Sequence, residues 1–322
     1  MPDWPAWILL HAAAAAAVTV WALRYALRRR LLDQPGERRS HDQATPRGGG
    51  VAIVVVLLLG CAWLIAAFPP ARGQLSAFAA GLLLVAGIGW LDDHRPLAPW
   101  PRLAVQAVAG LLLAWAAWSA GGQIWLAVAA FVLAMGLVNV WNFMDGINGL
   151  ATSQAMIAAA GLALVLPQPW NWLAAGLAAA AAGFLPFNFP RARIFLGDVG
   201  SGGLGYALAA LLAAGLVAAP DAYGWLALPV CAFVVDAGFT LAWRMLKGER
   251  WWTPHVEHVY QRWARRHGHV TICTAYAVFS VGAVGLMLHG LRPGGAAGAW
   301  IPGFWYLGAA LVWIWGHGKE HG

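Results

Sequence analysis

Long apolar runs, separated by short polar segments, fill most of this sequence. Reading for apolar runs of about 17 to 25 residues, we find eleven, near residues 5–27, 50–68, 75–91, 103–119, 123–141, 151–166, 172–187, 204–219, 224–243, 271–289 and 300–316. A run of this kind crosses the hydrocarbon layer of a bilayer as a helix, because its backbone polar groups must be satisfied internally. The pattern predicts an all-α, polytopic integral membrane protein with about 11 transmembrane helices.

The composition supports a membrane protein. Hydrophobic residues make up 61% of the 322 residues, charged residues make up 10%, and the mean hydropathy is +0.65. In a soluble domain roughly 25% of the residues are charged. The polar segments are short, so we expect one membrane domain over residues 1–322, with polar loops at 28–48, 92–103, 142–150, 188–203 and 244–270.

The basic residues predict the orientation of the helices. If the eleven runs alternate in direction, 18 of the 20 Lys and Arg residues fall on one face, and Arg72 and Arg292 fall on the other. By the positive-inside rule the crowded face is cytoplasmic, which places the N-terminus outside and the C-terminus in the cytoplasm. The pI near 9.8 is then explained by these loops, and no nucleic-acid partner is implied.

Acidic residues gather at the cytoplasmic ends of the predicted helices. Asp92 and Asp93 end the third run, Asp145 lies in NVWNFMDGINGL, Asp198 lies in RIFLGDVGSGG, and Asp236 lies about two turns inside the same boundary. An ionisable group at such depth is a functional candidate unless it faces a partner. A single Asp at a helix end is most often a cap, but two adjacent carboxylates repel each other, and a bound cation relieves that repulsion.

Two of these segments surround an Asp with glycines and polar side chains. Asp145 has Asn142, Asn148 and two glycines close by, and Asp198 has Ser201 and four glycines. Glycines permit close backbone approach, and a glycine-rich turn that enters a helix offers N–H groups to an anion. A plain turn or helix break is the alternative in both places, and the second segment alone is a weak signal.

Two further segments on the same face carry cationic and imidazole side chains. The segment ERRSHDQATPRGGG contains Arg38, Arg39, His41 and Arg47, and the segment WWTPHVEHVYQRWARRHGH contains His255, His258, Tyr260, Gln261 and Arg262. If the second segment is helical, the spacing of its first two histidines places both imidazoles on one face. A basic amphipathic helix on anionic lipid is the alternative; it explains the tryptophans and arginines but leaves the histidines unexplained.

The constellation suits a cation and phosphates. Mg2+ is held by one or two carboxylates together with substrate phosphate oxygens and waters, whereas a carboxylate-rich set without paired Cys spacing argues against zinc or copper. A site at the cytoplasmic membrane boundary favours a reaction between a water-soluble phosphate compound and a lipid phosphate. A divalent cation and Arg side chains would reduce the repulsion between two such anions.

LDDHRPL, NVWNFMDGINGLA, NFPRARIFLGDVGS and the His-rich segment resemble the signature blocks of the polyprenyl-phosphate N-acetylhexosamine 1-phosphate transferase superfamily, glycosyltransferase family 4. RRSHDQATPRGGG resembles a loop of its non-peptidoglycan branch, and the likeness runs in order from about Asp33 to Arg262. The resemblance implies transfer of HexNAc 1-phosphate from a UDP-N-acetylhexosamine to undecaprenyl phosphate with release of UMP. It also implies Mg2+ as cofactor, with Mn2+ as the alternative ion, and a bacterial inner-membrane enzyme whose active site faces the cytoplasm.

The resemblance also implies roles for single residues. Asp198 would be the main metal ligand, and Asp92 and Asp93 would hold the lipid phosphate, with Asp92 also at the metal. Substrate would be bound by Arg47, Asn142, Asp145, Asn148, Asn188, His255, His258 and Arg262. A phosphate monoester is largely dianionic at neutral pH, so base catalysis by Asp92 is secondary. We expect direct in-line attack and no covalent aspartyl intermediate.

The chain departs from the family pattern at two places. Asn148 stands where most members have Asp, which puts its nucleobase contact in doubt. HVEHVYQRW replaces the H-x-H-H cluster of the peptidoglycan enzyme and resembles the branch that initiates O-antigen synthesis. We therefore expect the first membrane step of O-antigen or other cell-surface polysaccharide synthesis, with the peptidoglycan-type transferase as the alternative. Dimers are common among such relatives, which makes a homodimer one alternative, but the sequence does not determine the oligomeric state.

A polytopic transporter is the main alternative from another class. An intramembrane carboxylate such as Asp236 and glycine-interrupted helices are found in transporters too. A transporter would carry its carboxylates near mid-membrane and repeat one half in the other, whereas here they gather at one face and no repeat is evident. A nonenzymatic scaffold with the same fold is the third alternative, and an activity assay separates it from an enzyme.

Overall fold

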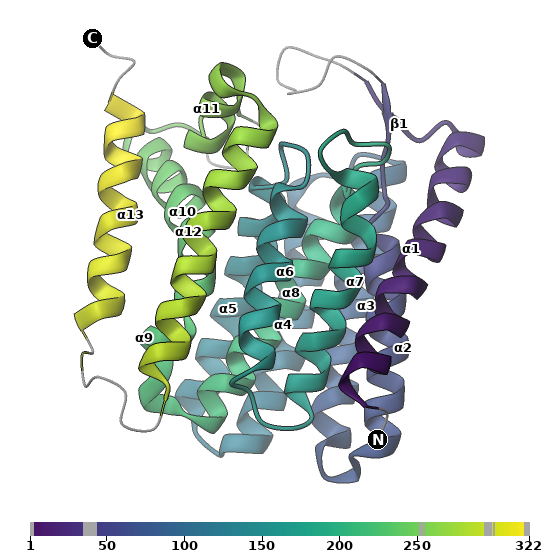
Figure 1. The fold of residues 1–322 in the computed structure, drawn as a ribbon, viewed down its shortest axis with the longest axis vertical. Coiled ribbons are helices and arrows are strands. Elements are labelled where there is room, and N and C mark those ends of the chain that lie inside the picture. The colour runs from purple at the N-terminus through teal and green to yellow at the C-terminus, as the bar shows by residue number, and fades with distance from the viewer. Residues whose placement is uncertain are drawn as a thin grey trace.

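The computed structural model describes residues 3–34, 44–250, 253, 255–292, 298 and 300–318. In Figure 1 the helices run side by side along the long axis of the molecule and are joined by connections at its two ends. Several residues of the sequence analysis lie outside the described residues, namely Arg38, Arg39, His41, Trp251 and Trp252.

Helices account for nearly all of the regular structure. They are α1 (Trp4–Arg29), α2 (Val51–Ala67), α3 (Arg72–His94), α4 (Pro99–Gly121), α5 (Ile124–Phe143), α6 (Leu150–Ala163), α7 (Trp170–Asn188), α8 (Gly197–Ala218), α9 (Tyr223–Leu226), α10 (Cys231–Leu246), α11 (Val259–His267), α12 (His269–Gly290) and α13 (Trp300–Gly318). Short 3-10 helices lie at Pro69–Ala71, Pro220–Ala222 and Leu228–Val230. Each of the eleven apolar runs found in the sequence falls on helical structure.

The helix lengths agree with a polytopic membrane protein. Within the described residues, eight helical segments are long and apolar enough to cross a membrane. The apolar helices α2 and α6 are shorter, with 17 and 14 residues. The helical, multi-pass class is therefore confirmed, while the number of crossings and the orientation stay predictions.

Prolines and glycines explain where several helices begin and end. Helix α4 begins at Pro99, whose fixed φ suits the first helical position, and it ends before Gly122, which has a φ of 68°. The ninth apolar run, predicted as one segment over 224–243, is interrupted: α9 ends and α10 begins on either side of a 3-10 turn that contains Pro229. A proline lacks the N–H that a continuous helix requires there.

Helix α8 lies at the centre of the bundle, because it packs against both α3 and α5. Glycines permit this close packing. A Cβ atom at Gly89 of α3 would overlap the backbone of Asp198, and one at Gly205 of α8 would overlap the backbone of Leu137. The start of α8 is thereby held against the last turns of α3.

A short antiparallel pair of strands, β1 (Leu32–Asp33) and β2 (Thr45–Pro46), departs from the all-helical prediction. Backbone bonds extend from it to the segment before α8: Phe195 N–H donates to the Pro46 carbonyl at 2.7 Å, and Gly49 N–H donates to the Phe195 carbonyl at 2.9 Å. The connection between α1 and α2 is therefore fixed against the entry to α8. In Figure 1, β1 and α11 both lie at the end of the molecule opposite the N-terminus.

Candidate active site

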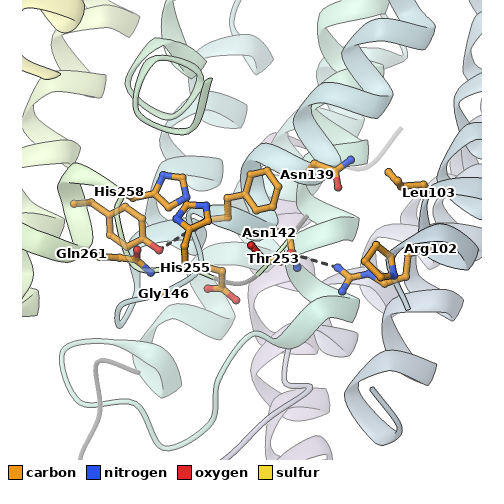
Figure 2. A pocket seen from close by; sticks show the side chains of 13 residues that line it. Arg102, Leu103, Asn139, Asn142, Gly146, Thr253, His255, His258 and Gln261 are labelled. Atoms are coloured by element: carbon orange, nitrogen blue, oxygen red, sulfur yellow. Dashed lines mark hydrogen bonds between the residues drawn. The ribbon is translucent and has the colours of Figure 1, made fainter. Parts of the chain in front are cut away.

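Four polar side chains from four helices meet at this end of the bundle. Asp92 lies in the last turn of α3, Arg102 in the first turn of α4, Asn142 in the last turn of α5 and Asp198 in the first turn of α8. Arg102 joins them: its Nη1 lies 2.9 Å from Asp92 Oδ2 and 3.4 Å from Asp198 Oδ2, and its Nη2 donates to Asn142 Oδ1 at 3.3 Å. Figure 2 shows the contact between Arg102 and Asn142. We call these four residues the polar cluster.

Further hydrogen bonds orient the members of the polar cluster. Asn142 Nδ2 donates to Asp198 Oδ1 at 2.6 Å and to Ser201 Oγ at 3.2 Å. Asp92 Oδ1 accepts the backbone N–H of Leu97 at 2.6 Å. The Asp92 and Asp198 carboxyl groups are near each other, because Arg102 Nη1 lies within 3.4 Å of an oxygen of each. Two neighbouring carboxyl groups require a proton or a cation to relieve their repulsion.

Asp93 has a different environment from its neighbour. Its Oδ1 accepts the backbone N–H of Asp198 at 3.1 Å, its Oδ2 accepts that of Val199 at 3.2 Å, and the residue is 3% exposed. Arg47 donates to the Asp93 carbonyl oxygen, and its Nε lies 4.0 Å from Asp93 Oδ1. Asp93 therefore caps the N-terminus of α8 from another helix. It takes up N–H groups that the glycine-rich turn was expected to offer to an anion.

A cavity of about 300 Å³ lies beside the polar cluster, and we call it the polar cavity. It is lined by Pro99, Arg102, Leu103, Asn139, Asn142, Phe143, Asp145, Gly146, Thr253, His255, His258, Tyr260 and Gln261, as Figure 2 shows. Its volume is at the lower end of the range of small-molecule sites. The lining residues come from α4, α5, the loop after α5, and the segment that precedes and begins α11.

Asp145 joins the polar cavity from the loop between α5 and α6. Burial, together with the negative charges of Asp198 and Asp93, raises the pKa of Asp145 well above its usual range. A cation bound nearby would favour the ionised form and lower that pKa again. The loop thus places a carboxyl group where it would respond to a bound ion.

His255 and His258 meet at the wall of the polar cavity although they do not share a helix. His258 is the N-cap of α11, and His255 lies in the non-helical segment before it. Their ring centroids are 4.8 Å apart, and the His258 ring also lies against Phe143 and Tyr260. Burial, and after it the neighbouring His258 and Arg244 side chains, lowers the pKa of His255 to about 4. His255 is therefore neutral at pH 7.

The other predicted substrate residues lie outside the cavity lining. Asn188 joins two loops, since its Oδ1 accepts the N–H of Gly149 at 3.0 Å and its Nδ2 donates to the Ile194 carbonyl at 3.1 Å. Asn148 Nδ2 donates to the Pro190 carbonyl at 3.1 Å. Arg262 Nη1 lies 3.2 Å from a ring nitrogen of His317 in α13. Their substrate contacts stay predictions.

Sequence reasoning missed the central position of Arg102. In the sequence it is one of many basic residues on the crowded face, although it follows the Asp92–Asp93 pair closely and lies in the first turn of the next helix, at the same end. Tyr260 and Gln261 were noted as polar but were not predicted as lining residues. Tyr260 OH donates to the Phe143 carbonyl at 2.8 Å, and this bond ties α11 to the end of α5.

The residues fit a magnesium ion that is shared with a substrate. Among the described residues, no three His, Cys, Asp or Glu side chains are grouped so as to hold a metal by themselves. Mg2+ does not require such a set, because it commonly takes one or two carboxylates and completes its shell with phosphate oxygens and waters. The carboxyl groups of Asp92 and Asp198, both beside Arg102 Nη1, would supply oxygen ligands of this kind.

Comparison with known proteins gives consistent matches. Residues 75–216 match the model of glycosyl transferase family 4. The chain is 26% identical over 268 residues to a probable undecaprenyl-phosphate N-acetylglucosaminyl 1-phosphate transferase of Bacillus subtilis, covering 76% of this chain and 73% of that protein. It is 33% identical to a decaprenyl-phosphate N-acetylglucosaminephosphotransferase of Mycolicibacterium smegmatis, covering 64% of this chain and 59% of the relative.

Another branch of relatives matches as well. The chain is 33% identical over 195 residues to a phospho-N-acetylmuramoyl-pentapeptide-transferase of Acaryochloris marina, covering 52% of each protein. The region matched by the family model begins in α3 and ends in α8. It therefore contains all four residues of the polar cluster.

Proposed function

This chain belongs to the polyprenyl-phosphate sugar-1-phosphate transferase superfamily, and on that premise we propose that it transfers N-acetylhexosamine 1-phosphate from a UDP-sugar to undecaprenyl phosphate. An oxygen of the lipid phosphate attacks the phosphorus that carries the sugar. The bond from that phosphorus to the bridging oxygen breaks, and UMP leaves with the bonding electrons. The products are UMP and a lipid diphosphate sugar.

The observation that carries this proposal is the polar cluster beside the polar cavity. Two phosphate groups repel each other by about 4 kcal/mol for one pair of unit charges at 4 Å and an effective dielectric constant near 20. Arg102 supplies a positive charge at the point where Asp92 and Asp198 meet. The two carboxyl groups supply ligands for a cation, and the neighbouring cavity supplies room for part of a nucleotide sugar.

We assign the residues as follows. Asp198 and Asp92 would hold Mg2+, which when bound neutralises phosphate charge. Asn142 orients Asp198 through their 2.6 Å hydrogen bond. Asp145 and the two histidines line the space for the donor. Because a lipid phosphate is largely dianionic at neutral pH, attack does not require a strong base, and Asp92 acts mainly in positioning.

The transporter alternative fits the site less well. Asp92, Asp145 and Asp198 lie at one end of the helices and not halfway along them. The carboxyl group deeper inside, Asp236, already accepts the backbone N–H groups of Val259 and Tyr260 at 3.0 Å each. A carboxylate that is bonded in this way is not free to bind and release a transported ion.

We further propose that the enzyme lies in the bacterial inner membrane with the polar cavity facing the cytoplasm, where UDP-sugars are found. The His-rich segment reads HVEHVYQRW in place of the H-x-H-H cluster of the peptidoglycan enzyme. For this reason we assign the enzyme to the first membrane step of O-antigen or other cell-surface polysaccharide synthesis. Two relatives are named as N-acetylglucosaminyl 1-phosphate transferase and N-acetylglucosaminephosphotransferase, and these names support the proposal that the donor is a UDP-N-acetylhexosamine.

A donor panel tests this function. Membranes that contain the protein are incubated with undecaprenyl phosphate, Mg2+ and one of UDP-GlcNAc, UDP-GalNAc, a UDP-6-deoxy-HexNAc or UDP-MurNAc-pentapeptide, and the lipid product is identified by mass. We expect a HexNAc lipid diphosphate and equimolar UMP with at least one of the first three donors. Product from the pentapeptide donor alone would support the peptidoglycan-type reaction, and product from none would contradict the proposal.

A further inference from the structure

We propose that Asp236, inside the membrane-spanning part of α10, is a positioning residue that holds the imidazole of His258 at the wall of the polar cavity and thereby sets the affinity for the nucleotide-sugar donor. This inference rests on the proposed function, because the donor is the ligand whose binding is affected. Asp236 itself is absent from the cavity lining, so it acts through His258.

The contacts of Asp236 lead from α10 to the start of α11. The residue is 3% exposed, and its two oxygens accept the backbone N–H groups of Val259 and Tyr260 at 3.0 Å each. Tyr276 OH donates to Oδ2 at 2.7 Å. The Nδ1 atom of His258 lies 3.8 Å from Oδ1. One carboxylate therefore fixes the backbone after His258 and also faces its ring.

The His258 ring has one nitrogen turned to Asp236 and lines the cavity. It is 2% exposed and lies between the rings of Phe143, His255 and Tyr260. Its Nδ1 has no hydrogen-bond partner among the described residues, apart from the electrostatic contact with Asp236. A carboxylate beside one ring nitrogen favours the proton on that nitrogen and fixes the ring orientation. Nε2 is then the nitrogen available to a ligand.

Helix capping alone does not explain why the residue is an Asp. Asn and Ser cap helices about as well as Asp, and a charge at this depth costs more than a neutral group. The carboxylate adds a negative charge beside the imidazole, and this charge is what orients the proton of His258. The aspartate is therefore suited to acting on the histidine as well as on the helix.

A second residue, Arg244, also holds the backbone near His258. The effect of Asp236 on the His258 ring can therefore be separated from its effect on the backbone. Arg244, also in α10, bonds Glu257 at 2.5 Å, Glu249 at 3.1 Å and the Thr253 hydroxyl at 3.2 Å. Replacing Asp236 by Asn removes the charge but leaves these contacts and one side-chain acceptor for the N–H groups of α11. The Asp236→Asn variant should therefore fold.

A double-mutant cycle tests the proposal. The variants Asp236→Asn, His258→Ala and the combination of both are purified, and kcat and the donor KM are measured. We expect each single change to raise the donor KM about tenfold, with kcat altered less than about threefold. The double variant should have a donor KM no higher than that of the single variant with the higher KM, because both changes remove the same interaction. A KM increase equal to the product of the two single effects would show that Asp236 does not act through His258.

Tyr276→Phe is the matched control. It removes a hydrogen bond from the same carboxylate and leaves the charge and His258 in place. We expect the donor KM to stay within about twofold of the wild-type value. An increase as large as that of Asp236→Asn would mean that the carboxylate acts through packing of α10 and α12, and the proposal would be wrong.

A spectroscopic measurement separates this inference from the proposed function. In the wild-type protein labelled with 15N-histidine, we expect the His258 side-chain signals of an imidazole protonated at Nδ1, and in Asp236→Asn we expect those signals to shift. Identical His258 signals in the two proteins would overturn the positioning role. The spectra remain informative even if the donor panel yields no product, a result that would count against the proposed function alone.

Discussion

Asp198 accepts a side-chain hydrogen bond from Asn142 and faces Arg102, which also binds the carboxyl group of Asp92. These residues come from three other helices, so Asp198 depends on tertiary structure for its position. An amide at this position has nearly the shape of the carboxylate and keeps one oxygen that can accept from Asn142 or Arg102, but it is a much weaker cation ligand. Charge at Asp198 can therefore be removed with little change of shape.

We predict that Asp198→Asn reduces UMP release by at least about 100-fold, because loss of a ligand or of charge stabilisation at a phosphoryl-transfer site has effects of this order. UMP release from the preferred UDP-HexNAc is measured in membranes, and size-exclusion chromatography confirms folding. Asp221→Asn, an exposed residue at the other end of the bundle, is the control and should retain wild-type activity. Full activity of Asp198→Asn would remove this residue from the metal site.

His255 gives a prediction for the pH dependence of stability. Its pKa falls from 6.5 to about 4 on folding, because burial and nearby positive charges penalise the protonated ring. Between these values the unfolded chain binds a proton that the folded protein does not, so this residue lowers stability as the pH falls from 6.5 toward 4. His255→Gln should reduce the loss of thermal stability between pH 7 and pH 5. An unchanged loss would contradict a buried, neutral His255.

At the scale of the elements, two helices have their first turns completed by carboxylates from elsewhere. Asp93 at the end of α3 accepts two N–H groups of α8, and Asp236 of α10 accepts two N–H groups of α11. The usual cap is a side chain immediately before the helix. Here each cap instead joins two segments that are far apart in the sequence.

The cap on α8 predicts a measurable loss of stability. Asp93→Ala leaves the N–H groups of Asp198 and Val199 buried without their acceptor, which costs about 1 to 3 kcal/mol. We expect the thermal unfolding midpoint in detergent to fall by several degrees, with Asp93→Asn intermediate because it keeps one acceptor. Asp221→Ala provides the comparison and should leave the midpoint unchanged. Equal midpoints for Asp93→Ala and the wild-type protein would show that the cap contributes little.

The helices could be predicted from the sequence because hydropathy is a local property. Each apolar run falls on helical structure, but the break near Pro229 was not predicted, although proline is a residue type that a helix tolerates poorly. The caps could not be predicted, since the spacing between Asp93 and Val199 contains no local signal. The sequence also did not indicate that the pairing of β2 with the segment at Phe195 would hold Arg47 beside Asp93.

For the site, the sequence identified most of the groups but not their contacts. Asp92, Asn142 and Asp198 were expected to converge, and the structure brings them together through Arg102. Asn188 was expected to bind the substrate, which stays a prediction, and its side chain bonds Gly149, Thr152 and the Ile194 carbonyl. Buried amides that stabilise loops and amides that bind ligands have the same composition, so only the fold distinguishes them.

At the scale of the whole molecule, α11, whose first residues line the polar cavity, lies at the end opposite the N-terminus (Figure 1). Most basic residues among the described residues lie in helix ends and connections at this end, so the positive-inside rule predicts that it faces the cytoplasm. Native Cys61, Cys231 and Cys273 are buried. Accessibility of introduced cysteines can therefore test the orientation against a low background.

We predict that Asp221→Cys is labelled by a membrane-impermeant maleimide added to intact cells, and that Lys247→Cys is labelled only after the membrane is opened. Asp221 is exposed between α8 and α9, and Lys247 is exposed just after α10, at the opposite end of the bundle. Labelling is read from the mass of the protein. The reverse pattern would place the polar cavity outside the cell and contradict a reaction that uses cytoplasmic UDP-sugars.

The caps that Asp93 and Asp236 place on α8 and α11 have a consequence for the order in which the chain assembles during synthesis. In both pairs the carboxylate belongs to the earlier segment, α3 before α8 and α10 before α11. Synthesis proceeds from the N-terminus. Asp93 and Asp236 are therefore made before the backbone N–H groups of α8 and α11 that they accept in the folded protein. In that interval the two aspartates lack the helix N–H groups that they accept in the folded protein, so these contacts between distant segments can form only after the later helix has been made.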